Sequence, residues 1–182
     1  IEAVAEAIER FAAGIPLVVD PVMVAKGGAP LLASDAGAAL IARLVGRATL
    51  ITPNIPEAEA LLGRAIPDRA AMEAAARDLL RLGPRAVLLK GGHMEGEEVA
   101  DLLVDSRGEH VFSGPRIAST STHGTGCTLA AAVADAIAQG RELADAVARA
   151  RAYVRRAIET APGLGRGHGP LNHLHCVGEF RG

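Results

Sequence analysis

The chain of 182 residues is 49% hydrophobic and 22% charged, with a formal net charge of −2. This length and composition predict one globular domain over residues 1–182 and exclude a disordered chain. A near-neutral charge with one Tyr and no Trp disfavours a nucleic-acid-binding surface.

No apolar run reaches the length that a membrane-spanning helix needs, so no membrane partner is expected. The two cysteines, Cys127 and Cys176, are too few and too far apart for a disulfide framework. This favours a reducing, cytoplasmic location.

Short apolar runs alternate with amphipathic segments along the chain. The apolar spacing predicts helices over 2–13, 34–45, 57–62, 69–82, 127–139 and 143–160. Strands are predicted over 17–19, 48–51 and 86–89, with a hairpin of 99–105 and 109–113. This alternation is typical of an α/β fold with a mainly parallel central sheet covered by helices.

Each of the three predicted parallel strands ends on polar residues. Asp20 follows the first strand, Thr52 and Asn54 the second, and Lys90 the third. Ligands of open α/β sheets bind outside the carboxyl ends of the strands, so these side chains are expected at one edge. Glu57 lies three residues after Asn54, at the start of a predicted helix, where the two side chains can face the same cleft.

These residue types fit a phosphate and a divalent cation. Asp20 and Glu57 supply oxygen ligands for Mg²⁺, and Lys90 is a point charge suited to phosphate. Each also has a purely structural interpretation: Asp20 with the following Pro starts a turn, Glu57 complements a helix dipole, and Lys90 is solvated.

Gly124, Thr125, Gly126 and Cys127 follow a Ser/Thr-rich run and lead into an Ala-rich helix. Glycines let the backbone approach a ligand, and the N–H groups and dipole of a helix N-terminus favour an anion. A thiol placed there has its pKa lowered. The motif predicts an anion hole for phosphate with a catalytic side chain, Cys127; the structural alternative is a simple strand-to-helix turn.

A metal, a cation, backbone donors and a group at the acceptor are the parts that phosphoryl transfer needs. In addition, five segments resemble the hydroxymethylpyrimidine/phosphomethylpyrimidine kinases of thiamine biosynthesis, which belong to the ribokinase-like superfamily: 18–26, 51–58, 88–93, 122–129 and 167–170.

The resemblance implies a ribokinase-like three-layer αβα fold. It also implies ATP and Mg²⁺ as cofactors and two successive phosphorylations, of 4-amino-5-hydroxymethyl-2-methylpyrimidine and then of its monophosphate. The expected partner is thus a small pyrimidine, and family members are commonly homodimers.

The resemblance assigns roles residue by residue. Cys127 acts at the acceptor oxygen, Lys90 holds the transferring phosphates and Asp20 lies near the metal. Asn54 and Glu57 match an Asn-x-x-Glu element that organises Mg²⁺. The anion hole is formed by Gly124, Thr125 and Gly126.

Two departures from the family pattern accompany these matches. Family members begin with a glycine-rich segment that helps to form the pyrimidine pocket, and this sequence has none, so the chain is expected to be incomplete at its N-terminus. Lys26, Gly27 and Gly28 replace the usual Lys-Ser-Gly.

Other functions compete with this interpretation. The nearest is a pyridoxal-type kinase on the same scaffold, and a different class is a non-catalytic nucleotide- or pyrimidine-binding homologue. A Rossmann dehydrogenase is disfavoured because its glycine motif follows the first strand.

Overall fold

The computed structural model describes residues 1–23 and 36–177. The chain divides into two compact units, Ile1–Pro115 and Arg116–Gly182, and each is described by itself. The predicted loop at Lys26 and the predicted helix start at Ser34 lie outside the described residues. The single domain over residues 1–182 stays a prediction.

The first unit is built on a five-stranded sheet in the order β1-β2-β3-β4-β5. Its strands are β1 (Val18–Val19), β2 (Leu50–Ile51), β3 (Ala86–Leu89), β4 (Glu98–Asp105) and β5 (Gly108–Pro115). β1, β2 and β3 pair in parallel, whereas β3–β4 and β4–β5 pair antiparallel. The parallel strands and the hairpin are therefore where the sequence predicts them.

Helices of the first unit are α1 (Glu2–Phe11), α2 (Ala36–Arg43), α3 (Ile55–Leu62) and α4 (Arg69–Leu80), with a 3-10 turn at Val45–Arg47. α3 begins two residues earlier than predicted, because Asn54 caps it and a proline is tolerated in its first turn. Gly63 ends α3 with φ +66°, a conformation that suits glycine.

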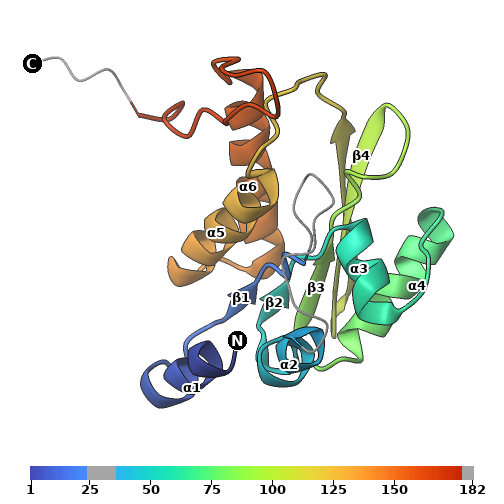
Figure 1. The fold of residues 1–182 in the computed structure, drawn as a ribbon, viewed down its shortest axis with the longest axis vertical. Helices are drawn as coiled ribbons and strands as arrows, with labels where there is room; N and C mark the ends of the chain where they lie inside the picture. Colours follow the sequence, from blue (N-terminus) through green and yellow to red (C-terminus); the bar gives the residue numbers. More distant parts are fainter. Residues whose placement is uncertain (24–35, 178–182) are drawn as a thin grey trace, which may run out of the picture. The chain divides into compact units, whose positions relative to one another are not determined.

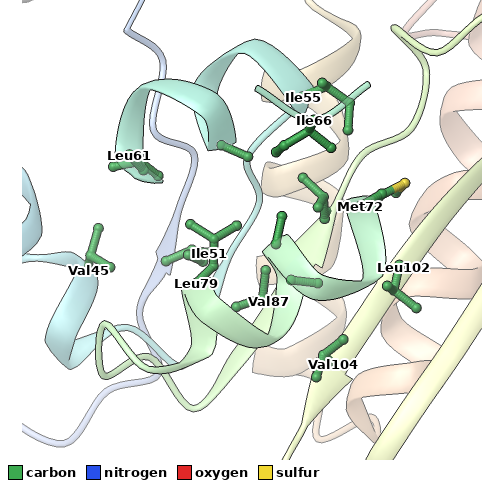
Figure 2. Packing of buried hydrophobic residues seen from close by; sticks show 14 of the residues in the cluster. Val45, Ile51, Ile55, Leu61, Ile66, Met72, Leu79, Val87, Leu102 and Val104 are labelled. Carbon is green, nitrogen blue, oxygen red and sulfur yellow. The ribbon is translucent and has the colours of Figure 1, made fainter. Parts of the chain in front are cut away.

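One buried cluster joins α3 and α4 to a face of the sheet (Figure 2). The cluster contains Met72 and Leu79 of α4 together with Val87 of β3 and Leu102 of β4. Every residue of β3 is buried, which fits a central strand with a continuous apolar run. Figure 1 shows α3 and α4 side by side next to β3. The burial of the apolar strands in this cluster therefore determines the position of the polar residues that follow them.

The second unit contains α5 (Thr125–Ala138) and α6 (Leu143–Glu159), which pack against each other. Both helices bury small residues, among them Ala136 and Ala150, and these permit a close helix–helix contact. α5 begins at Thr125, so the predicted start at Cys127 is two residues late. Among the described residues, no helix is long and apolar enough to cross a bilayer.

Candidate active site

Asp20, Thr52 and Lys90 meet at the carboxyl edge of the three parallel strands. Lys90 Nζ lies 2.9 Å from Asp20 Oδ1, and Thr52 Oγ1 donates a hydrogen bond of 2.9 Å to the same oxygen. The side chains of Asp20 and Lys90 are each 12% exposed, and Thr52 is fully buried. The structure thus brings together the three strand ends that the sequence singled out, with Lys90 in an ion pair.

The backbone of Lys90 is bonded to the end of the neighbouring strand. Its N–H donates to Pro53 O at 2.8 Å, and Lys90 forms an isolated parallel bridge with Asn54. Asn54 therefore lies beside the lysine, as expected for polar residues that follow adjacent parallel strands.

Asn54 and Glu57 form a reciprocal cap at the start of α3. Glu57 N–H donates to Asn54 Oδ1 at 2.9 Å, and Asn54 N–H donates to Glu57 Oε2 at 2.8 Å. This capping box satisfies two backbone donors that the helix leaves without an acceptor. Both side chains thus have a structural role, and their roles in nucleotide and Mg²⁺ binding stay predictions.

Burial raises the pKa of the Glu57 carboxyl, which is only 5% exposed. The hydrogen bond from the Asn54 backbone and the charge of Lys90 act in the opposite direction, whereas the charge of Asp20 raises the pKa further. At Glu57 the charge of Lys90 therefore outweighs the like charge of Asp20, and burial is the main reason that the pKa is raised.

The donor set fits Mg²⁺ without a dedicated protein cage. Within residues 1–23 and 36–177, no group of three or more His, Cys, Asp and Glu side chains is placed to hold a metal. Mg²⁺ commonly takes one or two carboxylates, several waters and substrate phosphates. Hydrogen bonds among the described residues use Oδ1 of Asp20 and Oε2 of Glu57, which leaves the second oxygen of each carboxylate for a hydrated cation.

The glycine motif of the second unit forms the N-terminus of α5. Gly124 is the N-cap with φ +81°, and a Cβ there would meet nothing within 4 Å, so glycine is needed for the backbone conformation rather than for space. Thr128 N–H donates to Gly124 O at 2.9 Å, which closes the first helical turn. Thr125 and Gly126 are the first two residues of α5. An α-helix offers no internal acceptor to the N–H groups of its first residues.

Cys127 is the third residue of α5. The prediction that Cys127 is the first residue of this helix is therefore wrong. Cys127 is exposed, and neither it nor Cys176 forms a disulfide. The thiol therefore belongs to the same helical turn as Thr125 and Gly126, where the helix dipole favours negative charge. Its catalytic role stays a prediction.

The polypeptide before α5 is held by backbone bonds to the end of a glycine-rich segment. Gly169 N–H donates to Thr120 O at 3.1 Å, and His123 N–H donates to Gly169 O at 3.2 Å. A Cβ on Gly169 would lie 2.7 Å from the buried Ser121 Oγ. This contact explains why glycine stands at position 169.

One residue at this edge of the sheet was missed by the sequence analysis. Asp101 lies within β4, is 7% exposed, and accepts the Gly91 N–H through Oδ1 at 2.9 Å. The signal for it is a carboxylate between Ala100 and Leu102, within a run from Val99 to Val104 whose other residues are apolar.

The family model of phosphomethylpyrimidine kinase matches residues 1–172 of the chain. The chain belongs to this family. It is 53% identical over 165 residues to the thiamine biosynthesis bifunctional protein ThiED of Geobacter sulfurreducens, covering 91% of this chain and 34% of that protein. It is 46% identical over 178 residues to a hydroxymethylpyrimidine/phosphomethylpyrimidine kinase of Rhizobium meliloti, covering 96% of this chain and 66% of that one.

Solved structures of related kinases share the fold. The ADP complex of Bacillus subtilis pyridoxal kinase superposes with a TM-score of 0.85 at 30% identity, covering 96% of this chain and 65% of that one. The phosphomethylpyrimidine kinase of Clostridium difficile superposes with a TM-score of 0.72 at 37% identity, covering 85% and 62%. The predicted ribokinase-like α/β fold is confirmed by these similarities. The chain spans between a third and two thirds of the length of the proteins compared here.

Proposed function

We propose that this protein transfers a phosphoryl group from ATP to 4-amino-5-hydroxymethyl-2-methylpyrimidine and then to the resulting monophosphate. The observation that carries the proposal is the Lys90–Asp20 pair at 2.9 Å, at the carboxyl edge of parallel strands. Membership of the phosphomethylpyrimidine kinase family supports the substrate class.

Lys90 supplies a positive charge for the transferring phosphate. Its ammonium is largely buried and is held by Asp20, so it is placed before a ligand arrives. A fixed charge of this kind stabilises the negative charge of the phosphoryl transition state without first having to reorganise. A phosphate oxygen beside Nζ would share the ammonium with Asp20.

The start of α5 supplies donors for an anionic oxygen. The N–H groups of Thr125 and Gly126 point out of the first helical turn, where negative charge is stabilised. Cys127, in that turn, positions or deprotonates the hydroxyl of the acceptor. The side chain of Thr128 is engaged elsewhere, since its Oγ1 donates to Gly124 O at 2.7 Å.

Asp20 and Glu57 would hold Mg²⁺, directly or through water, and Asn54 would fix Glu57 through the capping box. Bound to ATP, the cation would neutralise phosphate charge during transfer. The charge of Asp20 acts on Glu57, so the two carboxylates are near each other, and this supports the assignment because Mg²⁺ commonly takes one or two carboxylates together with waters and substrate phosphates.

Pyridoxal is the second candidate substrate. The observation that favours it is structural, since Bacillus subtilis pyridoxal kinase superposes with a TM-score of 0.85, against 0.72 for the phosphomethylpyrimidine kinase of Clostridium difficile. A non-catalytic nucleotide- or pyrimidine-binding homologue is the third candidate, and the exposed Cys127 opposes it because binding alone does not need a nucleophile-sized thiol.

ADP release tests the proposal. The product of the complete gene is assayed with Mg-ATP and, separately, with hydroxymethylpyrimidine, its monophosphate and pyridoxal. Turnover of both pyrimidines is expected. Turnover of pyridoxal alone would replace the substrate, and ATP binding without any turnover would favour the non-catalytic homologue.

A cytoplasmic homodimer belongs to the same proposal. The absence of a disulfide at Cys127 and Cys176 fits a reducing compartment. Sedimentation equilibrium of the same preparation measures the oligomeric state, and a monomeric mass at micromolar concentration would contradict the dimer.

A further inference from the structure

Asp101 is a buried carboxylate in a strand where the neighbouring side chains are apolar. It lies in β4 between Ala100 and the core residue Leu102, and it is 7% exposed. Burying a charged group is unfavourable unless hydrogen bonds compensate it. The hydrogen bond from Gly91 N–H to Asp101 Oδ1, at 2.9 Å, is one such compensation.

This bond lies where β3 stops pairing with β4. The antiparallel ladder runs as far as Leu89, which pairs with Leu102. Two residues later, Gly91 passes so close to β4 that a Cβ on it would lie 2.0 Å from Ala100 O. Beyond Leu89, the hydrogen bond from Gly91 N–H to the Asp101 side chain thus connects this part of the chain to β4 in place of a bond of the backbone ladder.

Lys90 stands between two anchored backbone groups. Its own N–H is bonded to Pro53 O at 2.8 Å, and the next N–H, of Gly91, is bonded to Asp101. The first bond ties the lysine to the chain after β2, and the second ties it to β4. Rotation or displacement of the Lys90 backbone would break one of them.

We propose that Asp101 is a positioning residue for Lys90: its carboxylate holds Gly91 and so fixes the point from which the lysine side chain reaches Asp20. This inference rests on the proposed function, in which Lys90 holds the transferring phosphate. A displacement of the lysine on the order of 1 Å would be expected to lower the rate by about a hundredfold.

The rival explanation is that Asp101 only stabilises the chain where β3 ends. Asp105 provides a matched control, because it is a carboxylate at the C-terminal end of the same strand and also accepts backbone N–H groups. Its Oδ1 accepts the N–H groups of Arg107 at 2.8 Å and of Gly108 at 3.2 Å, in the turn between β4 and β5.

Steady-state kinetics of D101A, D101N and D105A in the product of the complete gene separate the two explanations. D101A is expected to lower kcat by about a hundredfold. D101N keeps an oxygen acceptor for Gly91 and is expected to retain most of the activity. D105A should lower the thermal unfolding temperature and leave kcat unchanged. Equal kcat values for folded D101A and D105A would overturn the proposal, as would a D101N enzyme no better than D101A.

A readout that is independent of turnover separates this proposal from the proposed function. The ¹³C-dimethylated Lys90 signal, assigned through K90R, reports the surroundings of Nζ even if none of the substrates is phosphorylated. D101A is expected to move this signal toward that of an exposed lysine, and D105A is expected to leave it in place. If D101A does not fold, D101S provides the same test with a side chain too short to hold Gly91. An unmoved Lys90 signal in the folded variant would refute the positioning role.

Discussion

Asn54 and Glu57 each accept a hydrogen bond from the backbone N–H of the other, at 2.9 and 2.8 Å. The residue proposed to bind Mg²⁺ therefore also starts α3. A substitution of Glu57 can remove the helix cap, the proposed metal ligand or both. Two different replacement residues are therefore needed to separate the two effects.

E57Q isolates the proposed metal role. Gln also serves in a capping box, so the unfolding temperature should change little, while removal of the charge raises the Mg²⁺ concentration that half-saturates activity. E57A should in addition lower the free energy of unfolding by about 0.5–2 kcal/mol. D68A is the control, because Asp68 caps α4 by accepting the Ala71 N–H at 2.8 Å. An E57Q enzyme with a wild-type Mg²⁺ titration would rule out the ligand role.

The raised pKa of Glu57 makes stability depend on pH with a definite sign. A carboxyl whose folded pKa lies above its unfolded value favours folding at low pH, and this contribution is lost as pH rises through the folded pKa. Urea denaturation should therefore show a decline in stability above pH 4.5, the ordinary value for Glu, that is absent in E57Q. Parallel pH profiles for the two proteins would contradict this assignment.

The Lys90–Asp20 pair predicts a non-additive double-mutant cycle. K90M leaves the Asp20 carboxylate largely buried without its partner, which is expected to cost about 3–5 kcal/mol of stability. K90M/D20N removes both charges and should be more stable than K90M. K90M should also raise KM for ATP, since the phosphate loses a fixed charge. Additive stability losses would show that the two side chains do not interact in solution.

Much of this site could be predicted from the sequence because parallel strands align their carboxyl ends. Asp20, Thr52 and Lys90 each follow an apolar run. Because these runs pair as parallel strands, the three residues lie together at the carboxyl edge of the sheet. The start of α5 was placed two residues late because glycine disfavours helix interiors, a penalty that matters less in a first turn with Gly124 as its cap. Asp101 was missed because its partner, Gly91, is known only once β3 and β4 are paired.

Adjacent glycines give a matched test of the backbone crossing after Lys90. G91A places a Cβ 2.0 Å from Ala100 O, whereas a Cβ on Gly92 meets nothing within 4 Å. G91A should therefore lower the free energy of unfolding by about 1–3 kcal/mol or more, as overpacking does. G92A should be close to wild type in urea denaturation. Equal stabilities would show that β4 yields at this point.

The two cysteines give a matched test of the nucleophile-sized side chain. Cys127 lies in the first turn of α5 and Cys176 near the end of the described chain, and both are exposed. C127A should lower kcat by about a hundredfold or more if the thiol handles the acceptor proton. C176A should be as active as wild type in the same ADP-release assay. Full activity of C127A would exclude the role.

The backbone bonds between Gly169 and the residues before α5 turn the second unit into a closed ring of polypeptide. The chain leaves Thr120, runs through α5 and α6, and returns at Gly169 to bond with Thr120 and His123. Opening of the ring breaks both bonds together, so the His123 and Gly169 amides should exchange with solvent at a common rate. A cut in the chain between α6 and Gly169 would open this ring, although it removes no residue assigned to chemistry. The start of α5 would then be connected to α6 through Gly169 only by hydrogen bonds, among them that from Asn172 N–H to Ala157 O at 3.0 Å.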